Sequence, residues 1–394
     1  MPRFFRGFFI TLAISVAFLS GIYLGGHYYR LSPLLNIFPA SVRGAFFPGD
    51  NTLQLEREIE GILQEGFYQP VDQSTLENGA MEGMVNSLND PYTTYFSPDD
   101  YRMFNDHSNG QFTGIGVLME QKGENLTVVQ VFENSPAQES GVQSGDIIIA
   151  VDGKPVQGMT EEETSGLIRG SEGTTVTLKV LRGAAELEFM MTRRAIELPI
   201  VTEKMIDTGT RKIGYVRLEQ FSLDSGVKLR GAVDKLVGEG AEAIILDLRN
   251  NGGGLLDESI NVASTFIQDG PIVSVVGRDG ESQVYSARGD ANETIPLTLL
   301  VNGYSASASE IVAGAIKDDA RGRLVGEKTF GKGVVQSIVP LSNGGGLKYT
   351  AGSYYTPKGI DINKIGIEPD IPVGDDPATP VDEVLDRAVA ELAR

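Results

Sequence analysis

The segment AEAIILDLRNNGGG, residues 241–254, joins a continuous apolar run to a short polar turn and three consecutive glycines. An apolar run of this length, bounded by turn residues, is typical of a strand buried on both faces. Similar runs occupy residues 213–221, 295–302 and 322–327, with helical patterns at 256–267, 310–318 and, near the end of the chain, 381–392. Strands that alternate with helices in this way predict an α/β fold for residues 195–394.

The three glycines follow the C-terminal end of a predicted strand, which is where α/β sheets bind their ligands. A plain strand-to-helix turn is one interpretation of them, but such a turn does not require three glycines. Consecutive glycines also let a substrate backbone approach closely and leave backbone amides free to donate hydrogen bonds. Residues 252–254 are therefore part of a candidate site.

Three serines lie at a later strand-to-helix junction, in YSASASEI, residues 304–311. A serine at the start of a helix is often only a cap, because its side chain accepts a hydrogen bond from a backbone amide. The same place suits a catalytic serine, since free amides and the positive end of the helix dipole stabilise a developing oxyanion. Taken alone, the motif favours capping.

A lysine between two glycines follows, in TFGKGVVQ, residues 329–336. A lone lysine of this kind is usually solvated. Together with Gly326 it approximates a phosphate-binding loop, but Gly333 stands where Ser or Thr should hold magnesium. The order of the motifs along the chain is also wrong for a P-loop enzyme, so we reject nucleotide binding.

Composition limits the chemistry that these motifs can perform. The chain of 394 residues has no cysteine and two histidines, which excludes a thiol nucleophile, a disulfide, a thiolate metal site and a three-histidine zinc site. A net charge of −20 argues against nucleic acid, whose phosphates need basic patches. We expect no metal and no cofactor, and chemistry that uses Ser, Lys, Asp, Glu and backbone amides.

The N-terminus predicts membrane attachment. Residues 7–26 are uncharged and mostly apolar, and a helix of about twenty such residues crosses a bilayer. Arg3 and Arg6 precede the run, so the N-terminus should stay inside and the rest of the chain should be exported. A single-pass cell-membrane anchor is the favoured interpretation; a cleaved signal peptide is the alternative, although no clean cleavage site follows.

Residues 111–194 change to short β-rich runs with one helix, at whose start Thr160 and Glu163 form a capping-box pattern. Within them GIGV, residues 114–117, resembles the carboxylate-binding loop of PDZ domains. Small residues there expose amides to a terminal carboxylate, and the next strand edge accepts an extended peptide. The run SPAQESGVQSGDIIIAVDGKPV, residues 135–156, agrees with that family, and its Asp146 should fix the turn before a buried strand.

Together the landmarks occur in the order found in the C-terminal processing peptidases, also called tail-specific proteases. The chain resembles them over nearly its whole length, including SLNDPYTTYF at 87–96 and GIEPDIPV at 366–373. The resemblance implies four regions: a membrane segment at 1–30, a helical region at 31–110, an inserted PDZ domain at 111–194, and a peptidase core of crotonase-like α/β fold at 195–394. The flanking helices favour a homo-oligomer, as in relatives, and an adaptor protein is left open.

The resemblance also implies the roles of individual residues. The nucleophile would be Ser309, the serine just before glutamate, with Lys332 as general base and Gln336 to orient it. Proline is frequent in relatives where this chain has Gly252, so the oxyanion amides are expected from Gly253 or Gly254 together with Glu310. The peptide-binding residues of the PDZ domain would be Gly114, Ile115, Gly116, Val117, Leu167 and Arg169, with Arg169 reporting substrate occupancy.

A Ser-Lys pair fits the composition because it needs no histidine, and His107 should be dispensable. Free lysine is protonated at neutral pH, but burial disfavours its charged form, so a desolvated Lys332 can accept a proton. The sequence thus predicts an extracytoplasmic serine endopeptidase that cleaves exported polypeptides with apolar C-terminal tails. The alternatives are a membrane-tethered PDZ adaptor with an inactive core and, less favoured, a crotonase-type hydratase.

Overall fold

The computed structural model describes residues 51–123, 125–197, 199–375 and 378–393. The predicted membrane segment, residues 7–26, lies outside these ranges, and no helix within them is long and apolar enough to cross a bilayer. Contacts divide the chain into two units, residues 1–88 and 89–394, which we describe separately.

The first unit contributes two helices, α4 (Asn51–Gly66) and α5 (Gln73–Asn86), close to where the apolar spacing predicts them. Several of their large apolar side chains are exposed within the chain, among them Leu55, Ile59, Ile62 and Met84. The expected homo-oligomer is not tested by a single chain.

In the second unit, a six-stranded sheet forms the centre of the core, in the order β10-β11-β12-β15-β16-β19. The four inner strands β11 (Lys212–Leu218), β12 (Ala243–Asp247), β15 (Leu297–Val301) and β16 (Arg323–Gly326) are parallel and follow the apolar runs of the sequence. At the edges β10 (Val201–Asp207) is antiparallel to β11, and β19 (Ile371–Pro372) is parallel to β16. The α/β prediction for this region is confirmed.

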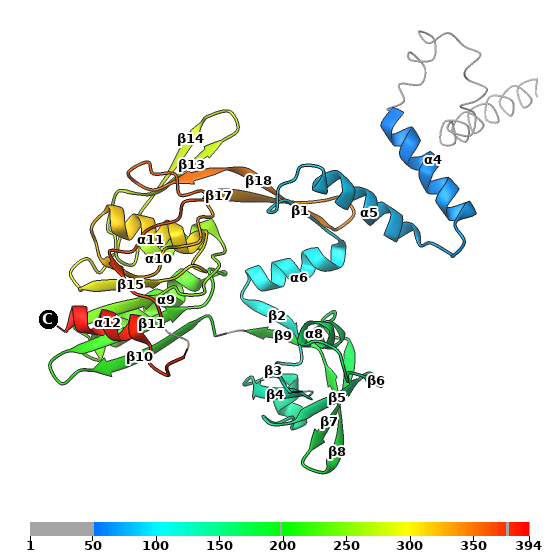
Figure 1. Cartoon of the computed structure of the whole chain (residues 1–394), viewed down its shortest axis with the longest axis horizontal. Coiled ribbons are helices and arrows are strands. Elements are labelled where there is room, and N and C mark those ends of the chain that lie inside the picture. Colours follow the sequence, from blue (N-terminus) through cyan, green and yellow to red (C-terminus); the bar gives the residue numbers. More distant parts are fainter. Residues whose placement is uncertain (1–50, 124, 198, 376–377, 394) are drawn as a thin grey trace, which may run out of the picture. The chain divides into compact units, whose positions relative to one another are not determined.

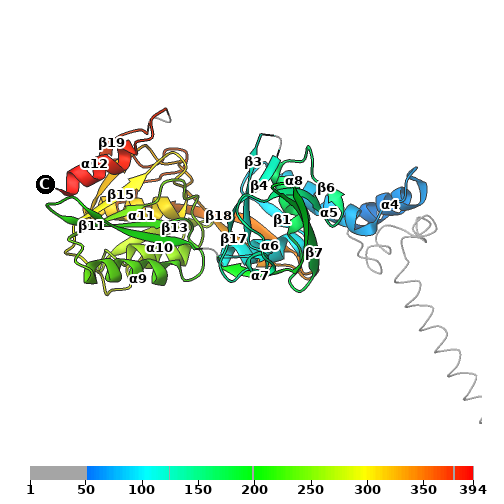
Figure 2. The same cartoon turned by 90° about the horizontal axis from the view of Figure 1, so that it is seen from below.

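Helices cover both faces of this sheet. One face packs on α9 (Ser225–Gly238), α10 (Leu256–Ala263) and α11 (Ala308–Asp318), and the other on α12 (Glu383–Leu392), on opposite sides of the sheet in Figure 2. Alternate strand residues serve the two layers: Leu246 faces the three helices and Ile245 faces α12. Burial on both faces explains why β12 is apolar at nearly every position.

A second, antiparallel sheet was not predicted. It contains β1 (Thr94–Phe96), β13 (Pro271–Gly277), β14 (Ser282–Ser286), β17 (Val334–Pro340) and β18 (Gly346–Tyr355). The long β18 pairs with β1, β13 and β17, and can be followed in orange in Figure 1. This sheet carries the lysine motif at the start of β17 and holds it against the start of α11.

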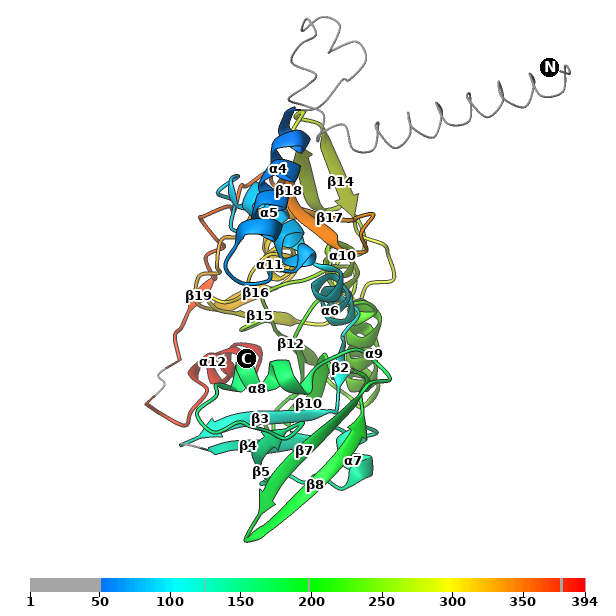
Figure 3. The ribbon, with the colours of Figure 1, turned by 90° about the vertical axis from the view of Figure 1, so that its right-hand side faces the viewer.

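The inserted domain is an antiparallel sheet of β3 (Val117–Lys122), β4 (Asn125–Val131), β5 (Ile147–Val151), β6 (Lys154–Pro155), β7 (Thr175–Arg182) and β8 (Ala185–Thr192), with the short helix α7 (Pro136–Ser140). Helix α8 (Glu161–Ile168) lies beside the edge strand β3 (Figure 3). The predicted capping box of Thr160 and Glu163 is present. Strands β2 (Gln111–Gly114) and β9 (Arg194–Glu197) pair where the domain joins the rest of the chain, and α6 (Pro98–Ser108) precedes β2.

Asp146 fixes the turn before β5, as expected. Its carboxylate accepts hydrogen bonds from the Gln143 amide at 2.9 Å and from Arg182 Nε and Nη2 at 2.7 Å each, and the residue is 1% exposed. Burial alone would raise the pKa of Asp146, but the hydrogen bonds from Arg182 and Gln143 and the charge of Arg182 bring it below its ordinary value of 3.8.

We predict that Asp146→Asn lowers the free energy of unfolding of this domain by about 1–3 kcal/mol, because Arg182 loses its buried partner. The contribution should be complete above pH 4 to 5 and should disappear as the pH falls through the lowered pKa of the folded state. Calorimetric melting at pH 7 and pH 3 measures both effects. The exposed Glu188 provides the control, since Glu188→Gln should change the stability by less than about 0.5 kcal/mol.

Candidate active site

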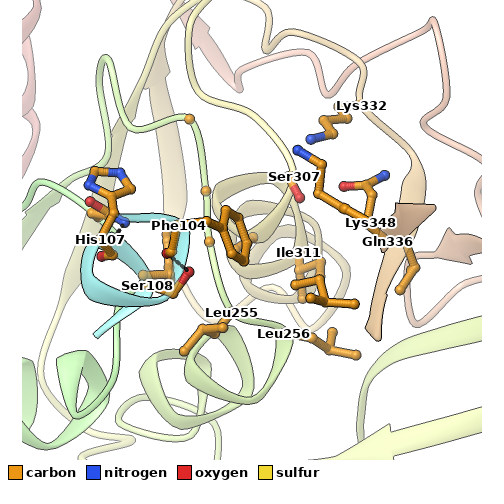
Figure 4. A pocket seen from close by; sticks show the side chains of 18 of the residues that line it. Phe104, His107, Ser108, Leu255, Leu256, Ser307, Ile311, Lys332, Gln336 and Lys348 are labelled. Carbon is orange, nitrogen blue, oxygen red and sulfur yellow. Dashed lines mark hydrogen bonds between the residues drawn. The ribbon is translucent and has the colours of Figure 1, made fainter. Parts of the chain in front are cut away.

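A cavity of about 520 Å³ opens where the core sheet, the antiparallel sheet and α6 meet. Its polar lining includes Ser307, Lys332, Gln336 and Lys348, and its apolar lining includes Phe104, Leu255, Leu256, Ile311, Val335 and Ile338 (Figure 4). The glycines 252–254 form another part of the wall. The serine, lysine and glycine motifs are thus brought together, as the sequence predicts.

The three serines of the junction differ in their surroundings. Ser305 Oγ donates to the Leu248 carbonyl at 2.8 Å, and Ser309 Oγ donates to the Asn251 carbonyl at 2.8 Å; both serines are 0% exposed. Ser307 lies between them and lines the cavity. The outer two serines therefore attach the turn to the glycine loop, and only the middle one presents its hydroxyl to the cavity.

This geometry does not fit the expectation that Ser309 is the nucleophile. Its side chain sits under the start of α11 and does not line the cavity. Ser307 replaces it as the candidate. Ser307 has φ 56° and ψ −113°, a backbone conformation that costs a non-glycine residue about 1–3 kcal/mol and that clusters at active sites. Its amide is held by Glu310 Oε2 at 2.9 Å.

Two of the amides expected at the oxyanion are already engaged. The Glu310 amide donates to the Ser307 carbonyl at 2.8 Å, and the Gly253 amide donates to Asn251 Oδ1 at 2.9 Å. The amide of Ala308, the first residue of α11, has no acceptor among the described residues and lies on the cavity wall, as do Gly252 and Gly254. The structure therefore shifts the helix contribution from Glu310 to Ala308.

Gly253 is needed where the glycine loop passes the serine turn. Its φ is +98°, and a Cβ there would lie 2.7 Å from the Ala306 carbonyl oxygen and 2.9 Å from the Ala308 nitrogen. Any side chain would push apart the two loops whose amides face the cavity. This close approach explains the glycines better than a plain turn does.

The side chain of Glu310, rather than its amide, has the larger role in the site. Its buried carboxylate accepts from the Ser307 amide at 2.9 Å, the Lys332 amide at 2.8 Å, the Gly331 amide at 2.7 Å and Thr329 Oγ1 at 2.6 Å. A single carboxylate thus fixes the backbone of the serine to the backbone of the lysine. The sequence gave no sign of this, because Glu310 also matches an ordinary helix-start acid.

Lys332 is half-buried, and its Nζ lies 4.7 Å from the ring centroid of Tyr92. Burial lowers the pKa of Lys332, and the charge of Lys348 lowers it further, whereas Glu310 and Asp90 act in the opposite direction. Within the described residues no carboxylate forms an ion pair with Lys332. The expected desolvated lysine is therefore present, although its predicted apolar neighbour Phe330 is 56% exposed.

Gln336 lines the same cavity, but its amide nitrogen donates to the Val334 carbonyl at 3.1 Å, and the structure shows no hydrogen bond between it and Lys332. A residue that the sequence did not indicate, Tyr354, contacts both motifs. Its hydroxyl donates to the Lys332 carbonyl and also interacts with the Ser307 side chain. The buried Tyr354 thus helps to hold the serine near the lysine.

The segment 89–96 packs on β18 beside this site. Asp90 Oδ2 accepts from Thr350 Oγ1 at 2.6 Å and from Thr93 Oγ1 at 2.5 Å, and Thr93 Oγ1 in turn accepts from the Thr350 amide. These bonds place the ring of Tyr92 under Lys332. The function of this motif is therefore to build one wall of the lysine's environment.

The predicted peptide-binding residues of the inserted domain lie on two elements. Residues 114–117 connect β2 to the open edge strand β3, and Leu167 and Arg169 lie at the end of α8. Ile115 is 1% exposed and packs in the core of the domain. Gly116 has φ +80°, and a Cβ on it would overlap Ser135. Arg193 supports this end of α8 by donating to the carbonyls of Ile168 and Leu167 at 2.7 and 3.1 Å.

Arg169 is exposed and lines a small cavity of about 130 Å³ together with Arg102, Asp106 and His107 of α6. Helix α6 also supplies Phe104, His107 and Ser108 to the catalytic cavity. Burial lowers the pKa of His107, and the charge of Arg169 lowers it further. In the described part of the chain, no group of three or more His, Asp or Glu side chains is placed to hold a metal ion.

A strained serine at a helix start, beside free amides, is the arrangement of a serine peptidase, and an open strand edge next to a helix is that of a peptide-binding module. Comparisons with known proteins agree. The model of peptidase family S41 matches residues 212–373, a PDZ domain model matches 113–192, and a model of the N-terminal domain of the activating protease CtpB matches 52–99.

The chain is 39% identical to the carboxyl-terminal-processing protease of Synechocystis over 74% of its own length and 69% of the relative's. It is 37% identical to a "Probable CtpA-like serine protease" of Staphylococcus haemolyticus, over 78% of this chain and 62% of that one. The solved photosystem II D1 C-terminal processing protease aligns with a TM-score of 0.52 and 32% identity, covering 86% of this chain and 91% of that one. The chain belongs to peptidase family S41, and it is a serine protease of the carboxyl-terminal-processing kind with a PDZ domain.

We predict that Glu310→Gln slows turnover by about 10–100-fold, because an amide NH₂ would face backbone N–H donors and loosen the serine from the lysine. The free energy of unfolding should fall by about 1–3 kcal/mol. Steady-state kinetics and chemical denaturation measure the two effects. Glu258 is the matched control: it is 6% exposed and accepts from the Gly226 amide at 2.8 Å, away from the cavity. Glu258→Gln should lose stability and keep its turnover, and equal turnover losses in the two variants would contradict this role of Glu310.

Proposed function

We propose that this chain is an endopeptidase that cleaves polypeptides near their C-termini, with Ser307 as nucleophile and Lys332 as general base. The observation that carries the proposal is that Ser307 and Lys332 face one cavity, at the start of α11, between loops joined by the Glu310 carboxylate. Gln336 remains the proposed residue that orients the amine once substrate is bound. The apolar lining of the cavity suits an apolar substrate side chain.

The reaction follows from these positions. The neutral amine of Lys332 takes the proton of Ser307 Oγ as that oxygen bonds to the scissile carbonyl carbon. The carbon–nitrogen bond then breaks, and Lys332 returns the proton to the leaving amine. Water, deprotonated by the same amine, releases the acid product and restores the serine. Burial of Lys332 makes the first step feasible because it lowers the pKa of that amine.

The negative charge of the tetrahedral intermediate is stabilised by backbone groups. We propose the Ala308 amide as one donor and an amide of the loop 252–254 as the other, since both lie on the cavity wall. The positive end of the α11 dipole adds to their effect. Known oxyanion donors of this kind contribute about 10²–10³ in rate.

The PDZ domain would select substrates by their C-terminal tails, bound along β3 beside α8. Arg169 at the end of α8 and the catalytic cavity share one neighbour, helix α6. A tail peptide that moves Arg169 therefore has a short physical path to Phe104 and His107. This path supports the proposal that tail binding realigns the site.

We also propose the extracytoplasmic location and the single-pass anchor at residues 7–26, on the sequence pattern alone. Sequencing the N-terminus of the mature chain from isolated membranes tests the anchor. Recovery of a soluble chain that begins after residue 26 would favour the cleaved signal.

We predict that Ser307→Ala abolishes cleavage of a tailed substrate, lowering kcat by at least about 10³-fold, and that Lys332→Ala does the same. Ser309→Ala should keep activity within about tenfold and lose about 1 kcal/mol of stability with its hydrogen bond to Asn251. Mass spectrometry of the substrate's new C-termini and thermal melts measure these effects. An active Ser307→Ala variant together with an inactive, folded Ser309→Ala variant would reverse the assignment.

We predict that Arg169→Gln reduces cleavage of a tailed substrate by about tenfold while the affinity for the free tail peptide stays within about threefold, because Arg169 acts on α6 rather than on the peptide. Calorimetric titration gives the affinity and a cleavage assay gives the rate. Arg278→Gln, on an exposed arginine of the β13–β14 turn, should change neither. A parallel loss of affinity and rate in Arg169→Gln would place Arg169 in the peptide site instead.

A further inference from the structure

The catalytic cavity contains a second lysine that the mechanism above does not use. Lys348 belongs to β18, is partly buried, and lines the same cavity as Ser307 and Lys332. In the close-up, the amino groups of Lys332 and Lys348 both lie on the side of the cavity that holds the Ser307 hydroxyl (Figure 4). Within the described residues Lys348, like Lys332, forms no ion pair with a carboxylate.

Aromatic rings take the place of a carboxylate at Lys348. Its Nζ lies 5.4 Å from the ring centroid of Phe96 and 5.8 Å from that of Phe104, whose rings stack on each other with centroids 4.9 Å apart. Ring faces attract a cation and have no comparable attraction for a neutral amine. Lys348 is therefore built to keep its charge in a partly buried place, without adding a negative group that would hold a proton on Lys332.

Two adjacent amines in one cavity do not both stay protonated easily, because like charges repel. Lys348 has two ring faces, whereas Lys332 has one, that of Tyr92. The neutral amine of the pair is therefore Lys332, the one that the reaction needs in that form. A neighbouring cation is an established physical means of activating a lysine.

We propose that Lys348 is a fixed positive charge, seated on Phe96 and Phe104, that holds Lys332 in its unprotonated form so that it can accept the proton of Ser307. This inference rests on the proposed function. It makes Lys348 a positioning residue in the electrostatic sense, since it acts on the substrate only through Lys332. Burial lowers the pKa of Lys348 as well, and the two ring faces oppose that effect.

The other ionisable groups around the pair are accounted for. Glu310 and Asp90 favour the protonated form of Lys332, but hydrogen bonds from three amides and a hydroxyl to Glu310, and from two threonines to Asp90, spread their charge. Of the remaining groups on the cavity wall, Glu219 is paired with Arg217 at 2.5 Å, the Tyr354 hydroxyl donates to the Lys332 carbonyl, and His107 lies on α6 with its pKa lowered by burial and by Arg169. None supplies the positive charge that Lys348 provides.

The test is the pH dependence of Ser307 labelling by an uncharged alkyl fluorophosphonate, which needs an activated serine but no tail peptide. In the wild type the labelling rate should rise with pH as Lys332 loses its proton. Removing the neighbouring charge in Lys348→Met should move this rise to higher pH, so that labelling at pH 7 is about tenfold slower while the maximal rate at high pH is kept. Lys348→Arg should keep the wild-type profile.

Lys204→Met is the matched control, because Lys204 Nζ lies 4.8 Å from the ring centroid of Tyr215, away from the cavity, and its loss should leave the profile unchanged. Lys348→Gln gives the same test if the methionine variant does not fold. An unmoved rise in a folded Lys348→Met or Lys348→Gln variant would overturn the inference, as would loss of labelling at every pH, which would make Lys348 itself the base. If the wild type is labelled at another serine or not at all, the proposed function falls as well, and mass spectrometry of the labelled peptide separates that result from the others.

Discussion

The buried carboxylate of Glu310 is the constraint on which the site depends. It accepts four hydrogen bonds, from the backbone of the serine turn and from the lysine loop, which belong to separate parts of the chain. Without it, a strained serine turn at the start of α11 and a glycine-flanked lysine would have no common reference. A charged acceptor surrounded by N–H and O–H donors is strong inside a protein, so this single residue can fix the distance between nucleophile and base.

Around this centre the fold separates two tasks. The parallel sheet and its helices fix the glycine loop and the serine turn, through Ser305, Ser309 and Asn251. The antiparallel sheet sets the electrostatics, since β17 and β18 bring in Lys332, Lys348 and Tyr354. Helix α6 lines both the catalytic cavity and the cavity beside Arg169, so the chain can link peptide recognition to chemistry through one short element.

Much of this could be predicted from sequence where burial is complete. The strands β11, β12, β15 and β16 stand out because both of their faces are covered. The antiparallel sheet and α9 were missed, because strands such as β14 and β17 are partly exposed and their apolar residues are mixed with polar ones. The fixed charge at Lys348 could not be found either, since the two phenylalanines beneath it precede it by more than two hundred residues in the chain.

The sequence by itself determined the α/β core, the inserted PDZ domain, the family and the motifs that meet at the site, because each depends on local pattern and order along the chain. Only the tertiary structure decided which serine of YSASASEI reaches the cavity. Three serines spaced two apart look equivalent in sequence, but the positive φ of Ser307 turns its side chain away from the carbonyls that bind Ser305 and Ser309. That difference is a property of backbone dihedrals and long-range hydrogen bonds, which no local pattern records.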